Sequence, residues 1–240
     1  MGRSETATVE TVKPNLHAKG SAAWDASDAV LAFLGRELKP GWRTLETGAG
    51  RSTLAFAGAG CRHEVVTPAA GEIAAIRADG ERQGLPMSAV TFHEGFSQDV
   101  LPRLAGVEDL DLVFIDGGHG FPIPAVDFQY LAPRLKVDGL MLIDDVDLWT
   151  GDMIVQVLKR DEAWRFQGLL NGRTAVFRKL APFTPHEWTK QPYVRRMSFW
   201  PQTRRKLVNG ARLIATGRFA AAAGKLANER RLAAAARDDA

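Results

Sequence analysis

Cysteine and long apolar runs are what this sequence of 240 residues has least of. The single cysteine, Cys61, excludes an intramolecular disulfide and fits a reducing compartment. We expect its thiol to pack as a small apolar side chain. No segment is apolar over the length needed to cross a bilayer, and the N-terminal segment lacks the apolar stretch of a secretory signal. These absences predict a cytoplasmic protein.

Charge of one sign gathers in the C-terminal segment. From Arg195 to the end there are eleven Lys or Arg residues against three Asp or Glu residues, so the rest of the chain is slightly acidic. From Thr203 to Arg237 the segment is rich in alanine and has helical spacing. A basic amphipathic helix can contact a membrane surface or a partner protein. The alternative is a solvated or packed terminal helix, and the sparse aromatic residues lead us to expect no nucleic-acid partner.

Three segments follow from these patterns. We predict a flexible arm over residues 1–22, a core over residues 23–181 and a basic helical extension over residues 182–240. A second copy of the chain is left open as a partner.

Short apolar runs alternate with helical segments through the core. The predicted strands are Arg43–Glu46, His63–Thr67, Val90–His93, Leu110–Ile115, Leu140–Ile143, Arg165–Leu169 and Thr174–Arg178. The predicted helices are one that begins near Trp24, then Ser52–Ala59, Glu72–Gln83, Phe121–Leu135 and Trp149–Asp161. This order predicts a doubly wound, Rossmann-like α/β fold whose seven-strand sheet is mostly parallel. The last two strands form a hairpin that adds an antiparallel strand at one edge, and helical extensions complete the fold.

The first strand runs into a glycine-rich turn, Glu46-Thr47-Gly48-Ala49-Gly50. Glycine permits positive φ and the close approach of a ligand, and the next helix offers free N–H groups at its start. A tight turn without a ligand is one interpretation, and a dinucleotide site or a phosphate-binding loop are two others. Thr53 stands where the dinucleotide fingerprint has its third glycine, and Arg51-Ser52-Thr53 lacks the Gly-Lys-Ser/Thr of a phosphate-binding loop.

The segment Trp42–Thr53 resembles the first motif of class I methyltransferases that depend on S-adenosylmethionine (SAM). It is most similar to a small bacterial group with an LExGxGxST start and an IDGxH fourth strand, and the resemblance covers about Asp28 to Lys179. The resemblance implies that Glu46, Gly48 and Gly50 contact the methionine part and the ribose of SAM. Two alternatives remain, an NAD-dependent oxidoreductase and a SAM-fold scaffold or tethering protein without catalysis.

Four more residues belong to the predicted SAM site: Thr53, Thr67, Ser97 and Asp116. The resemblance implies that Ser97 flanks the adenine. Thr67 ends the second strand, where the family commonly has an acid that binds the ribose hydroxyls. A threonine hydroxyl cannot act as a bidentate acceptor, so we expect a weaker ribose contact, with Glu72 as a less favoured substitute.

Three carboxylates follow the fourth and fifth strands: Asp116, Asp144 and Asp145. The ends of neighbouring parallel strands lie side by side, so these residues should converge. Their mutual repulsion favours a divalent cation such as Mg²⁺. Similarity to catechol-type O-methyltransferases implies that all three bind Mg²⁺, which in turn binds the substrate hydroxyls. Capping, cofactor contact or a metal-free site is the alternative, and we expect Asp127 to face solvent or to cap a neighbour.

His119 is the candidate general base and Asp116 the second catalytic candidate, because an imidazole exchanges protons near neutral pH. The alternatives for His119 are a metal ligand and a residue that orders its loop. The lysine base of the catechol enzymes has no counterpart in Gly118-His119-Gly120. The predicted function is SAM-dependent methylation of a small-molecule acceptor, at an oxygen of a sugar or phenol, with or without Mg²⁺.

Overall fold

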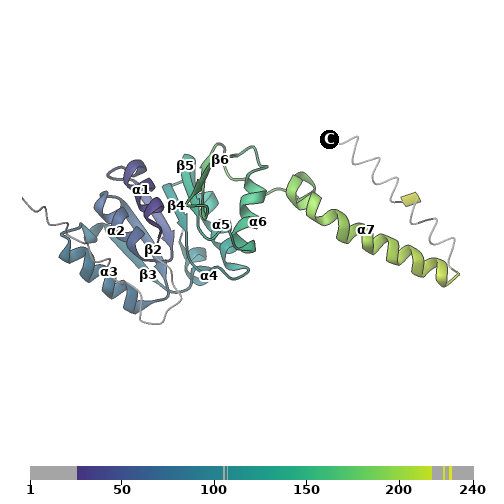
Figure 1. Cartoon of the computed structure of the whole chain (residues 1–240), viewed down its shortest axis with the longest axis horizontal. Helices are drawn as coiled ribbons and strands as arrows, with labels where there is room; N and C mark the ends of the chain where they lie inside the picture. The colour runs from purple at the N-terminus through teal and green to yellow at the C-terminus, as the bar shows by residue number, and fades with distance from the viewer. Residues whose placement is uncertain (1–25, 105, 107, 218–223, 225–226, 229–240) are drawn as a thin grey trace, which may run out of the picture. The chain divides into compact units, whose positions relative to one another are not determined.

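The computed structural model describes residues 26–104, 106, 108–217, 224 and 227–228 (Figure 1). The chain divides into two compact units, Met1–Pro185 and His186–Ala240. The arm predicted over residues 1–22 lies outside the described residues.

The first unit contains one sheet of seven strands in the order β3-β2-β1-β4-β5-β7-β6. The strands are β1 (Arg43–Thr47), β2 (Arg62–Thr67), β3 (Val90–Glu94), β4 (Leu110–Ile115), β5 (Leu135–Ile143), β6 (Trp164–Leu170) and β7 (Thr174–Lys179). Strands β1 to β5 pair in parallel, whereas β7 is antiparallel to both β5 and β6. The predicted seven-strand, mostly parallel sheet is confirmed, and the antiparallel strand β7 lies just inside the edge strand β6.

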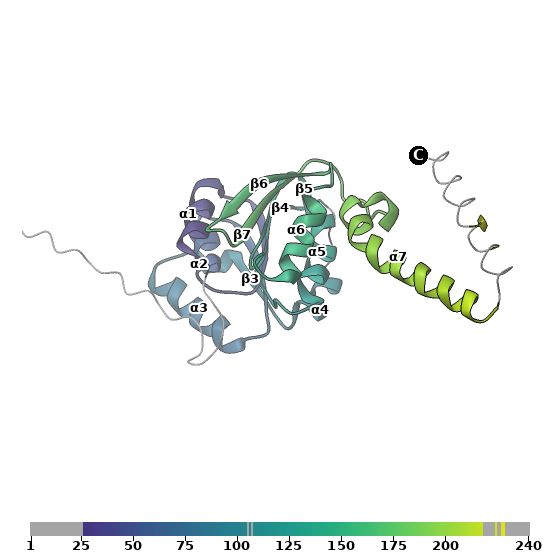
Figure 2. The same ribbon diagram turned by 45° about the vertical axis from the view of Figure 1, so that its right-hand side comes forward.

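Helices cover both faces of this sheet, as Figures 1 and 2 show. One face carries α1 (Asp28–Glu37), α2 (Arg51–Gly58) and α3 (Ala70–Arg82), and the other carries α4 (Ser97–Val100), α5 (Ile123–Arg134) and α6 (Trp149–Leu158). Two short 3₁₀ helices, η1 (Met87–Ala89) and η2 (Leu101–Arg103), lie in the connections. The Ser27 side chain accepts a hydrogen bond from the Val30 N–H and caps α1.

The central strands are apolar on both sides because each faces two helical layers. Leu112 and Phe114 of β4 pack in the core beneath α1 and α2, while Val113 and Ile115 pack with α5 and α6. This alternation follows from the two-residue period of a strand. Cys61 is fully buried, and burial raises the pKa of its thiol to about 11, which confirms the packed thiol that the sequence predicts.

The second unit holds the 3₁₀ helix η3 (Trp188–Lys190) and the long helix α7 (Pro192–Ala215). Helix α7 begins well before Thr203, so Phe199 and Trp200 belong to the basic helix. Most of the predicted helix beyond Gly217 lies outside the described residues. Within the described part of the chain, no helix combines the length and the apolar character that a membrane span requires.

Candidate functional site

The turn between β1 and α2 brings bare backbone to the carboxyl edge of the sheet. Gly48 has a φ of 86°, and a Cβ atom there would lie 2.1 Å from the carbonyl oxygen of Asp116. The Gly48 N–H donates to the carbonyl of Val66 at 2.9 Å, and the Asp116 N–H donates to the carbonyl of Thr47 at 3.0 Å. Only glycine fits at position 48, because both the backbone conformation and the adjacent β4 loop exclude a side chain.

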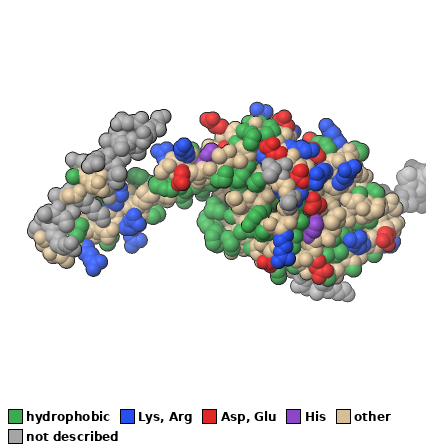
Figure 3. Space-filling model, turned by 180° about the vertical axis from the view of Figure 1, so that it is seen from behind, with side chains coloured by type: hydrophobic (Ala, Val, Ile, Leu, Met, Phe, Trp, Pro, Cys, Tyr) green, Lys and Arg blue, Asp and Glu red, His purple; other side chains and the backbone are tan. Residues whose placement is uncertain are grey.

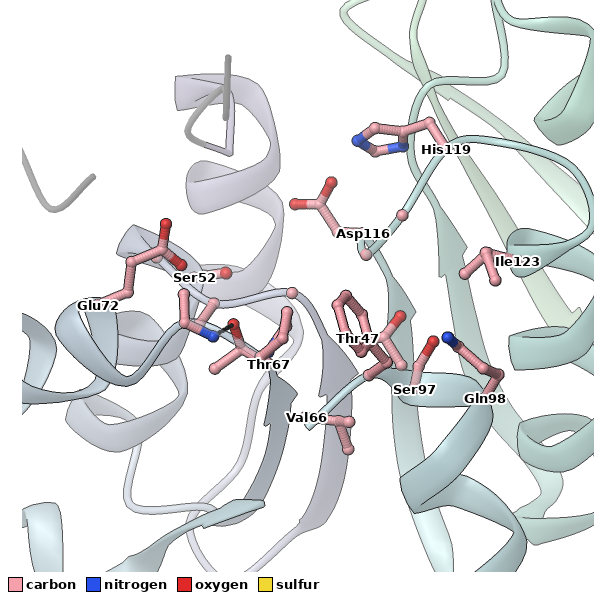
Figure 4. A pocket seen from close by; sticks show the side chains of 18 of the residues that line it. Thr47, Ser52, Val66, Thr67, Glu72, Ser97, Gln98, Asp116, His119 and Ile123 are labelled. Atoms are coloured by element: carbon pink, nitrogen blue, oxygen red, sulfur yellow. Dashed lines mark hydrogen bonds between the residues drawn. The ribbon is translucent and has the colours of Figure 1, made fainter. Parts of the chain in front are cut away.

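A cavity of about 460 Å³ opens over this turn (Figure 4). Its walls come from the glycine turn, the end of β2, the loop after β3 and the loop after β4. The cavity lies beyond the carboxyl ends of parallel strands, where open α/β sheets bind their ligands. Five of the predicted cofactor residues line it: Gly48, Gly50, Thr67, Ser97 and Asp116.

Glu46 and Thr53, in contrast, lie beneath the turn and are not among the described residues that line the cavity. The Glu46 side chain is only 1% exposed; its carboxylate accepts the Thr53 hydroxyl and lies 3.2 Å from Nε2 of His63. The Thr53 hydroxyl also accepts the Gly50 N–H at 3.2 Å. These contacts stabilise the glycine turn from its buried side. Direct contact of Glu46 or Thr53 with SAM stays a prediction.

The wall at the end of β2 contains a carboxylate, although the strand itself ends in a hydroxyl. Thr67 is buried, and its hydroxyl accepts the Ala69 N–H at 3.4 Å (Figure 4). Glu72, in the first turn of α3, lines the same side of the cavity. An acidic group is therefore present near the predicted ribose position, supplied by the helix after β2 rather than by the strand.

Asp127 of α5 is a buried carboxyl below the cavity, and the expectation that it faces solvent or caps a neighbour is wrong. Burial raises its pKa, while the hydroxyls of Ser97 and Thr47, which both line the cavity, lower it in part. Within the described chain, neither carboxyl oxygen makes a hydrogen bond of ordinary geometry. The helical period could have revealed this burial, because Leu131 lies one turn further along α5 and is also fully buried.

Asp144 and Asp145, which follow β5, both lie close to the side chain of Arg173 in the β6–β7 hairpin. The Arg173 guanidinium contacts Oδ1 of Asp145 and lies 3.6 Å from Oδ2 of Asp144. Oδ1 of Asp144 also accepts the Thr174 hydroxyl at 2.5 Å. Both carboxylates are largely buried and already have partners.

These contacts do not fit the predicted magnesium site of Asp116, Asp144 and Asp145. Over the described ranges, no group of three or more His, Cys, Asp or Glu side chains is arranged to hold a metal ion. The guanidinium supplies the positive charge that the prediction assigned to Mg²⁺. Arg173 was missed because it is distant in the sequence and approaches the pair only through the antiparallel pairing of β5 with β7.

Asp116 lines the cavity in an environment that disfavours its charge. Burial is the main reason that its pKa lies well above the usual range, and the negative charges of Asp144 and Glu46 raise it further. A hydrogen bond with Asp144 acts in the same direction. The free protein therefore keeps Asp116 protonated to a higher pH than an ordinary aspartate.

His119 lines the cavity, and its side chain contacts the carboxylate of Asp145. Its Nε2 lies 3.0 Å from Oδ2 of Asp145, and its side chain is 41% exposed. The Thr150 hydroxyl donates to the His119 carbonyl at 2.7 Å and ties this loop to α6. Beside the loop, the exposed rings of Phe121 and Trp149 lie 6.2 Å apart between centroids. The structure thus brings together the His119 imidazole, the Asp145 carboxylate and two exposed aromatic rings.

Comparison with known proteins supports the fold. A family model described as "Methyltransferase domain" matches residues 45–146. A putative O-methyltransferase from Klebsiella pneumoniae is similar with a TM-score of 0.55 and 20% identity, over 66% of this chain and 83% of that one. A cofactor-bound protein from MTB gives a TM-score of 0.52 and 20% identity, over 66% and 82%.

A methyltransferase from Geobacter sulfurreducens is also similar, with a TM-score of 0.54 and 16% identity over 66% of this chain and 82% of that one. At such identities the likeness shows a shared fold. Comparison with curated proteins gave no match.

Proposed function

We propose that this chain is a SAM-dependent methyltransferase of class I fold and that it methylates the hydroxyl oxygen of a small phenolic acceptor without a bound metal. The observation that carries the proposal is the His119–Asp145 pair, 3.0 Å apart, beside the cavity over the glycine turn. Each part of the proposal has separate support in the residues around that cavity.

The residues of the cavity fit SAM. Gly48 and Gly50 leave the backbone of the turn accessible, and the start of α2 offers N–H groups. Glu72 would hold the ribose hydroxyls, and Ser97 would flank the adenine. Asp116 would lie near the cationic part of the cofactor, where its carboxylate form is stabilised by positive charge. We therefore assign the cavity to SAM and the adjoining surface at His119 to the acceptor.

His119 would act as the general base. Its Nε2 faces Asp145, so an Nε2–H donated to that carboxylate leaves Nδ1 to accept the acceptor's proton. When bound, SAM supplies a methyl group whose bond to sulfur breaks as the acceptor oxygen bonds to its carbon, leaving the electron pair on sulfur. Asp145 stabilises the imidazolium that results, and Arg173 fixes Asp145. The chain thus contributes a base and fixed geometry, which suits a reaction that rests on approximation.

A phenol is the acceptor class that this base and surface favour. Phenolic hydroxyls titrate near pH 10, so an imidazole can remove their proton during attack far more readily than that of an aliphatic alcohol. The exposed Phe121 and Trp149 rings offer an aromatic acceptor a face on which to pack. A metal is not required to acidify such a hydroxyl, and Arg173 contacts the carboxylates that would otherwise bind one.

The test compares wild type with His119→Asn and with His186→Asn, which replaces an exposed histidine of the second unit. SAM affinity is measured by calorimetry, and methyl transfer to a panel of phenols and sugars is followed through formation of S-adenosylhomocysteine. We expect His119→Asn to lower kcat by about 10²- to 10⁴-fold while leaving SAM affinity unchanged, because it removes general-base catalysis alone. His186→Asn should behave as wild type.

The same experiment separates the alternatives. No heat with SAM or its demethylated product would overturn the cofactor assignment, and heat with NAD instead would favour an oxidoreductase. Tight SAM binding without transfer to any hydroxyl, with and without Mg²⁺, would favour a scaffold protein. Full activity of His119→Asn would remove the proposed base.

A further inference from the structure

The C-terminal helix α7 carries charge of a single sign. It contains six basic residues and no Asp or Glu: Arg195, Arg196, Arg204, Arg205, Lys206 and Arg212. All six side chains are exposed. In Figure 3 basic and hydrophobic side chains lie next to each other along this unit. Such a surface complements an anionic partner.

Large apolar side chains are exposed on the same helix. Trp200 is 73% exposed and Leu207 is 69% exposed, and Met197, Phe199 and Val208 are each more than half exposed. The rings of Phe199 and Trp200 pack edge to face with centroids 5.5 Å apart. A contiguous group of exposed apolar side chains on a soluble unit marks an interaction surface.

The spacing gathers most of these apolar side chains on one face. Trp200 follows Met197 by three residues, and Leu207 and Val208 follow Trp200 by seven and eight, which are spacings of a shared helix face. Arg204 lies on that face too, where its long aliphatic stem can lie along apolar surface with the charge at the rim. Phe199, Arg205 and Arg212 lie beside this face, and Arg195 lies opposite it.

We propose that α7 binds the surface of a membrane that contains anionic lipids and lies in the plane of that surface. Aromatic and aliphatic residues on one face with arginine and lysine around them are the composition of interfacial helices. The helix has low mean hydropathy and is not apolar enough to span the bilayer, so it would lie at the interface. Its basic side chains would meet the lipid phosphates, and Trp200 and Leu207 would enter the headgroup region.

A nucleic acid is the other polyanion that this charge could attract. It would use the arginines, and bases would stack on Trp200. Binding to a nucleic acid would not explain, however, why Leu207, Val208 and Met197 are exposed on the same face as Trp200. These aliphatic side chains favour a lipid surface as the partner. Their burial among lipids is stabilised by the hydrophobic effect, which a nucleic acid does not offer.

The test uses the full chain and sedimentation with vesicles of phosphatidylcholine alone or mixed in equal parts with phosphatidylglycerol. One double variant, Arg204→Gln with Arg205→Gln, removes charge but keeps helix propensity. A second, Trp200→Ser with Leu207→Ser, removes apolar contact. The matched controls are Arg165→Gln and Leu169→Ser, which alter exposed residues of β6 in the other unit.

We expect binding to the mixed vesicles and not to phosphatidylcholine alone, with binding weakened by salt. Each double variant should weaken it about tenfold or more, and the controls should not change it. Circular dichroism of the variants checks that α7 remains helical. Methyl transfer to a soluble acceptor should be unchanged in every variant, so failure here is distinct from failure of the proposed enzyme function.

Absence of binding to the mixed vesicles would overturn the proposal. So would binding that is insensitive to Trp200→Ser with Leu207→Ser, because it would show attraction by charge alone. Binding to single-stranded RNA that vesicles do not displace would assign α7 to a nucleic acid instead.

Discussion

Two neighbouring parts of the candidate site are built on different principles: the backbone wall of the cavity and a charged cluster beside the cavity. The wall made by β1, β2 and α2 is mainly backbone: a glycine turn fixed by hydrogen bonds to neighbouring strands, with Glu46 buried beneath it. The charged cluster follows the ends of β4 and β5, where Arg173 holds Asp144 and Asp145, none of which is among the described residues that line the cavity. The backbone wall should therefore tolerate little substitution, whereas the charged cluster can be changed one side chain at a time.

The largest expected effect is that of Gly48→Ala. The new Cβ would lie 2.1 Å from the Asp116 carbonyl at a positive φ, so backbone must move. We expect a loss of about 4 kcal/mol or more in the free energy of unfolding, together with loss of SAM binding. The matched control is Gly35→Ala in α1, where no atom lies within 4 Å; it should stabilise by about 0.5–1 kcal/mol. Thermal unfolding and calorimetry measure both, and a stable Gly48→Ala that binds SAM would contradict this view of the wall.

Arg173→Gln should be the most damaging change in the charged cluster. It leaves Asp144 and Asp145 without their cation, so we expect kcat to fall about 10- to 100-fold through misplacement of His119. The freed carboxylates should also gain an affinity for Mg²⁺, visible as a thermal shift that wild type lacks. Arg165→Gln, at an exposed site on β6, is the control. An unchanged kcat with no Mg²⁺ effect would show that Arg173 is not the counter-ion of this site.

The raised pKa of Asp116 predicts a pH dependence of SAM binding. In the free protein this pKa is raised, and the sulfonium charge should lower it on binding, so binding releases a proton. Affinity should therefore increase with pH, by up to about tenfold per unit, between the lowered pKa of the complex and the raised pKa of the free protein.

The demethylated product, which lacks the sulfonium charge, should show a weaker pH dependence in the same calorimetric titrations. In the Asp116→Asn variant, SAM affinity should not show this pH dependence. If the affinities for SAM and for the product depended equally on pH, Asp116 would not lie near the sulfonium group.

A smaller effect is expected for Glu72→Gln in the backbone wall. If Glu72 replaces the missing acid at Thr67, loss of its charge should weaken SAM binding about tenfold, through weaker hydrogen bonds to the ribose. Glu81→Gln, on an exposed turn of the same helix, is the matched control. Calorimetry decides: equal affinities of the two variants would mean that the ribose is held elsewhere.

The smallest expected effect is that of a chelator. Because Arg173 already neutralises the acidic pair, EDTA should leave kcat within about twofold of its starting value. Full loss of activity with EDTA, restored by Mg²⁺, would bring back the magnesium site at Asp116, Asp144 and Asp145. Steady-state rates with a phenolic acceptor provide the measurement.

The sequence by itself determined the order of elements, the sheet and the position of the turn at Gly48, because apolar period and glycine placement are local signals. Boundaries were less well determined: β5 begins at Leu135 rather than Leu140, and α7 begins at Pro192.

Only the tertiary structure decided which charged groups meet. Arg173 reaches Asp145 from another strand pair, Glu46 is buried rather than lining the cavity, and Asp127 lies below its floor. Charge neutralisation depends on distance and burial, which neither composition nor spacing along the chain encodes. The sequence predicted Mg²⁺ beside these carboxylates because it gave no sign that Arg173 contacts Asp144 and Asp145, and the magnesium site stays a prediction without support from the structure.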